Sequence, residues 1–137
     1  MAQHRDYFKD QMDQMGRLLG MLLADILGLK RDGNISEMNS LVQKTFTKDI
    51  GFDFEEVKNT SPGQLVYFLT EEKQFSDVHI QHVANILFEL GMEAETKSER
   101  EILYSRANVL YEYLNTVGTT FSFDFLLKMN RIKEELE

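Results

Sequence analysis

The sequence predicts one all-α domain over residues 1–137, an array of antiparallel helix hairpins with about six helices and a short helical turn. Apolar residues recur at spacings of three and four along most of the chain, which is the period of a helix that buries one face. The chain contains one proline among 137 residues, so long helices can form without interruption. Alternation of apolar and polar residues, which is typical of half-buried strands, is nearly absent.

The first helix is expected from about Arg5 to Leu29. Its apolar positions, Tyr7, Phe8 and Met12 among them, keep the helical spacing from the start. Basic residues follow at its carboxyl end, where they suit the negative end of the helix dipole. The second half of this helix is apolar almost all round, which predicts a central position or an interface.

Glycine, proline and capping residues divide the rest of the chain. Gly51 and Gly91 are expected to end helices, Pro62 to occupy a first helical position, and Asp77 and Ser122 to act as N-caps. The expected elements are Ser36–Lys48, a short acidic turn of helix within residues 52–59, Pro62–Lys73, a helix after Asp77 that ends at Leu90, a helix that ends near Val117, and Phe123–Leu136.

Small residues recur at every fourth position of the first helix, at Gly16, Gly20, Ala24 and Gly28. Positions four apart form one ridge of a helix, and a ridge without side chains admits a second helix at short distance. Each interior glycine costs a helix about 1 kcal/mol relative to alanine, so we expect close packing to offset that cost. The ridge either packs on a neighbouring helix of the same chain, which we favour, or forms a homodimer.

Composition excludes several classes of partner and chemistry. The net charge of −8 repels phosphate backbones, so neither nucleic acid nor an anionic membrane is an expected partner. The apolar run at residues 15–29 is shorter than the roughly 20 residues that span a bilayer, and it contains Arg17 and Asp25. The chain has no cysteine, which excludes disulfides and thiolate chemistry and fits a cytoplasmic protein. We expect no secretory signal, because charged residues are frequent among the first fourteen.

His79 and His82 are the only pair that suggests a metal or small-ligand site. They lie three residues apart on one expected helix, so both could contact one ion, but no third or fourth ligand is evident nearby. Adjacent carboxylates are frequent, yet they occur in acidic turns and helix ends rather than at positions that would face each other across a cleft. No phosphate loop or nucleophile elbow occurs. We therefore expect no enzymatic activity and no cofactor.

Tyr104 and Tyr111 are the candidate interaction residues. They lie seven positions apart on one side of their helix, near the edge of its apolar face. Tyrosines at a core edge can line a peptide groove, since each combines an apolar ring with a polar tip. They are also common as plain boundary residues, which is the interpretation we favour, and the groove stays open as the alternative.

The segment GNISEMNSLVQKTF at residues 33–46 resembles the turn and second helix of a tetratricopeptide repeat, although the repeat pattern is degenerate. The whole chain resembles a bacterial family of small tetratricopeptide-like helical proteins. The resemblance rests on the aromatic start leading into residues 11–19, on the GNISEM turn, and on residues 111–137. It implies an all-helical fold and no known activity, and it assigns no functional residues.

The leading functional hypothesis is a non-enzymatic, intracellular protein–protein interaction module. An exposed helical groove would recognise a peptide or helix, and the acidic surface would favour basic partners. The alternatives are a self-associating structural protein that dimerises through the small-residue ridge, and a metal or small-ligand binder that uses His79 and His82.

Overall fold

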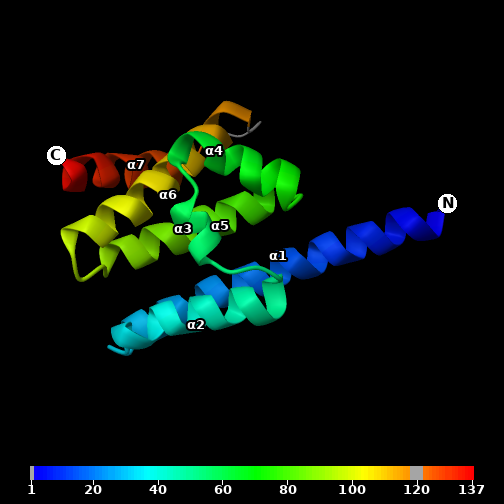
Figure 1. Cartoon of the computed structure of the whole chain (residues 1–137), viewed down its shortest axis with the longest axis horizontal. Helices are drawn as coiled ribbons and strands as arrows, with labels where there is room; N and C mark the ends of the chain where they lie inside the picture. Colours follow the sequence, from blue (N-terminus) through cyan, green and yellow to red (C-terminus); the bar gives the residue numbers. More distant parts are fainter. Residues whose placement is uncertain (1, 118–121) are drawn as a thin grey trace.

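The structure, a computed structural model, describes residues 2–117 and 122–137. Every regular element in these two ranges is helical, which confirms the predicted all-α class (Figure 1). The α-helices are α1 (Ala2–Arg31), α2 (Met38–Thr45), α3 (Glu55–Asn59), α4 (Pro62–Tyr67), α5 (Asp77–Met92), α6 (Lys97–Val117) and α7 (Phe123–Leu136). No helix in the described part of the chain is long and apolar enough to cross a membrane.

Three short helical segments extend this framework. A 3-10 turn at Ile35–Glu37 leads into α2, and wider π-type turns at Phe46–Ile50 and Phe68–Glu72 continue α2 and α4. Gly51 closes the first of the wide turns with φ of +108°, a left-handed conformation that glycine adopts without strain. The predicted end of the second helix at Gly51 is therefore confirmed.

Helix α5 is the centre of the domain. It packs against α1 on one side and against α6 on the other, and its buried residues come from both faces (Figure 1). α6 runs antiparallel to α5, as the contact of Tyr104 with Phe88 and that of Tyr111 with Asn85 show. α7 then packs on α6, where Tyr111 contacts Phe125.

Helices α1 and α5 run in the same direction. Gly16 and Gly20 lie against the first turns of α5, while the Lys30 ammonium donates to the carboxylate of Glu89 at 3.0 Å near the end of both helices. The Lys30 ammonium also lies 3.5 Å from the Glu93 carboxylate. α2 folds back on the second half of α1, so this half is covered from two sides.

Gly91 does not end a helix, which corrects the prediction made from its residue type. α5 continues to Met92, and Gly91 is buried within it. A Cβ atom at Gly91 would lie 2.5 Å from Cδ1 of Tyr104, far inside the van der Waals distance. Glycine is required here because the Tyr104 ring occupies the space that a side chain would need.

Candidate functional site

The first half of α1 projects beyond the rest of the domain (Figure 1). Its apolar side chains are exposed, with Tyr7 at 60%, Phe8 at 59% and Met12 at 43% of their accessible surface. Helical spacing of apolar residues therefore does not coincide with burial at the start of α1. α5 begins only at Asp77, and its first turn reaches α1 at Met12 and Gly16, so the side chains at the start of α1 stay exposed.

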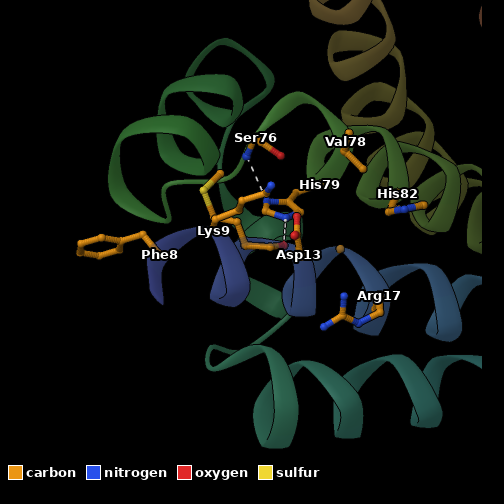
Figure 2. A pocket seen from close by; sticks show the side chains of 10 residues that line it. Phe8, Lys9, Asp13, Arg17, Ser76, Val78, His79 and His82 are labelled. Carbon is orange, nitrogen blue, oxygen red and sulfur yellow. Dashed lines mark hydrogen bonds between the residues drawn. The ribbon is translucent and has the colours of Figure 1, made fainter. Parts of the chain in front are cut away.

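A cleft of about 760 Å³ lies where the projecting half of α1 meets the start of α5 (Figure 2). Its apolar lining comes from Phe8 and Met12 of α1 and from Val78 of α5. Its charged and polar lining consists of Lys9, Asp13, Arg17, Ser76, His79 and His82. A concave site that combines apolar side chains with charged and polar groups is a usual form of binding site.

His79 joins the two walls of the cleft. Its Nδ1 atom accepts a hydrogen bond from the backbone N–H of Ser76 at 3.0 Å, which caps the start of α5. Its Nε2 atom lies 2.8 Å from the carbonyl oxygen of Met12 in α1 (Figure 2). Because an N–H can only donate and a carbonyl can only accept, the ring must be neutral, with its proton on Nε2. Ser76, rather than the predicted Asp77, is the N-cap residue of α5.

The first two glycines of the small-residue ridge lie beside His79 and His82. A Cβ atom at Gly16 would lie 3.7 Å from the His79 ring, and one at Gly20 would lie 3.5 Å from the His82 ring. These two glycines face α5 of the same chain. Ala24 is exposed, and a Cβ atom added at Gly28 would meet only the Arg31 side chain of the same helix. Two of the four ridge residues therefore lie in the α1–α5 contact.

His82 lies one turn after His79 and is partly buried. Burial, together with the nearby His79, lowers the pKa of His82 below the ordinary histidine value. Its Nδ1 atom is buried without a hydrogen-bond partner in the described structure. Both nitrogens of His79 are occupied by hydrogen bonds, so that ring offers no lone pair to a metal ion. No group of three potential metal ligands occurs within the described residues.

Tyr104 and Tyr111 do not line a surface groove, which corrects that interpretation and also their expected position at the core edge. Their exposed fractions are 1% and 0%. Tyr104 stacks on Phe88, and the Tyr111 hydroxyl donates to the side-chain oxygen of Asn85 at 2.6 Å. Burial raises the pKa of Tyr111 well above the ordinary tyrosine value. Both residues belong to the packed interface of α5, α6 and α7.

Comparison of the chain with protein-family models, curated proteins and solved structures found no match.

Proposed function

We propose that this protein is a non-enzymatic, intracellular interaction module of tetratricopeptide-like architecture from a bacterial cytoplasm. Its binding site is the cleft between the first half of α1 and the start of α5, and its ligand is a helical segment of a protein. The placement of the site differs from the sequence-based hypothesis, since Tyr104 and Tyr111 take no part in it.

The continuity of the α1 face carries this proposal. The face that packs on α5 at Gly16 and Gly20 is the same face that presents Met12 one turn earlier and Phe8 two turns earlier. Exposed apolar side chains clustered next to a cleft and rimmed by charge are typical of protein interaction sites. A helix that continued the line of α5 would cover them, as in recognition of an amphipathic helix by a groove.

The cleft is held in place before any ligand binds. The hydrogen bond from His79 to Met12 fixes α1 relative to α5 at the base of the cleft, and the Phe75 ring packs edge-on against His79 at 5.4 Å between centroids. A site that is already formed loses less conformational entropy on binding than a flexible one. This supports a binding role for the cleft.

Site-specific photo-crosslinking in the native cell tests the proposal. A photoreactive phenylalanine analogue at Val78, which lies in the cleft, should give a discrete crosslinked species. The same analogue at Tyr67, which is 61% exposed on α4, is the matched control and should give none. Adding Phe8→Ser and Met12→Ser to the Val78 protein should abolish the crosslink. Equal crosslinking from both positions, or a crosslink that survives these substitutions, would contradict the proposal.

A further inference from the structure

We infer that the helical segment that binds the cleft is the first half of α1 from a second copy of this chain, paired antiparallel to its counterpart. This inference rests on the proposed function, because it names the partner for the same cleft. Two-fold pairing requires a surface that is complementary to itself, so that each residue contact occurs twice. The first half of α1 has this property in both its charges and its apolar side chains.

Charge is the first element of self-complementarity. Lys9 and Asp13 lie four residues apart and both line the cleft. Neither forms an ion pair within the described part of the chain. In an antiparallel pair whose two-fold axis lies between positions 9 and 13, position 9 of each helix faces position 13 of the other. Lys9 of each copy then lies within reach of Asp13 of the other copy. The two copies of this segment together form two ion pairs.

The apolar side chains follow the same spacing. Phe8 and Met12 are also four residues apart, on the side of α1 that adjoins the two charges. The same two-fold axis places Phe8 of each copy beside Met12 of the other copy, so this contact also occurs twice. A thioether beside an aromatic ring is a favourable contact, and both side chains lose their exposure. The apolar pair therefore lies next to the ion pairs, as in the core and rim of an interface.

The local charge also favours a second copy at this place. The chain as a whole carries a net charge of −8, so two copies repel each other over most of their surfaces. The cleft lining contains Lys9 and Arg17 against the single carboxylate of Asp13. The cleft lining therefore does not share the negative balance of the chain as a whole.

Charge reversal followed by mixing tests the pairing, with sedimentation equilibrium of the full-length protein as the measurement. Lys9→Asp alone places two carboxylates opposite each other at both sites, and Asp13→Lys alone places two ammonium groups there. Each variant should show at least tenfold weaker self-association than the unsubstituted chain. An equimolar mixture of the two variants should recover association, because each introduced charge then meets its opposite. One chain with both substitutions should also dimerise.

Lys44→Asp is the matched control. Lys44 is exposed on α2, away from the cleft, so this variant should associate as the unsubstituted chain does. All variants should keep the same helical circular dichroism, since the changed side chains are exposed. A monomeric unsubstituted chain up to its solubility limit would overturn the inference, as would a dimer that Lys9→Asp does not weaken or a mixture that stays monomeric. A crosslink from Val78 to a different protein would then still support the interaction module.

Discussion

The imidazole of His79 bridges the carbonyl oxygen of Met12 and the backbone N–H of Ser76, at 2.8 and 3.0 Å. One neutral ring thus caps the start of α5 and fixes α1 at the point where α1 leaves the body of the domain. Gly16 lies beside this bridge, and a Cβ atom added there would be 3.7 Å from the His79 ring, an ordinary contact distance. The position of the cleft follows from this arrangement.

Replacement of His79 should loosen the base of the cleft. His79→Ala removes two hydrogen bonds of about 1 kcal/mol each and leaves a small cavity, so we expect the free energy of unfolding to fall by about 2–4 kcal/mol. Urea denaturation measures this loss. Val78→Ala, at the adjacent exposed position, should cost less than about 0.5 kcal/mol. Equal effects of the two substitutions would show that the His79 bridge does not hold α1.

Stability should fall in mild acid. The pKa of His82 is lowered in the folded protein, so the unfolded chain binds a proton first as the pH falls below about 6.5. The contribution of neutral His82 is complete above that pH and is lost as the pH falls toward its lower folded value. The thermal midpoint should therefore be lower at pH 5.5 than at pH 7.5, and His82→Gln should reduce the difference. A midpoint that rises in acid would refute this.

Gly91 should not tolerate even a methyl group. In Gly91→Ala the new Cβ would lie 2.5 Å from the buried Tyr104 ring, and overpacking of this kind costs about 1–3 kcal/mol. Gly63→Ala is the matched control in α4, because nothing lies within 4 Å of its added Cβ. The control should be neutral or slightly stabilising through the higher helix propensity of alanine. Guanidinium denaturation of both variants checks the contrast, and a stable Gly91→Ala protein would disprove the close contact.

The stability effect of substitutions at Gly20 should depend on the size of the new side chain. An added Cβ would lie 3.5 Å from the His82 ring, an ordinary contact distance, so Gly20→Ala should stabilise the protein by up to about 1 kcal/mol through helix propensity. Gly20→Leu should instead separate α1 from α5 and cost about 1–3 kcal/mol. Thermal denaturation distinguishes this packing role from a role in dimerisation: at the dimer ridge, Gly20→Leu would weaken self-association and leave the monomer stable.

Helical period and capping residues predicted the all-α class, the end of the second helix at Gly51, and the last helix from Phe123 to Leu136. These features depend on residues close together in sequence. Gly91 was misread because glycine serves equally to end a helix and to admit a close neighbour. Only the position of Tyr104 in space distinguishes these two uses.

The cleft was missed for a related reason. The spacing of Phe8 and Met12 shows that they share a face of α1. The point along α1 at which α5 begins depends on tertiary packing, which residue spacing does not indicate. The capping role of His79 is also not predicted from the sequence, because the usual capping box has Glu or Gln at the third helical position. The three-residue spacing of Ser76 and His79 is the sequence signal that could have indicated this cap.

The size of the native assembly in a gently prepared cell extract tests the central claim most directly. The unsubstituted protein should elute from a sizing column well ahead of the monomer, and Phe8→Ser with Met12→Ser should return it to the monomer position. Tyr67→Ser with Leu127→Ser, at exposed apolar positions on α4 and α7, should leave the assembly unchanged. A monomeric unsubstituted protein, or equal effects of the two pairs, would contradict the assignment of the α1–α5 cleft as the binding site.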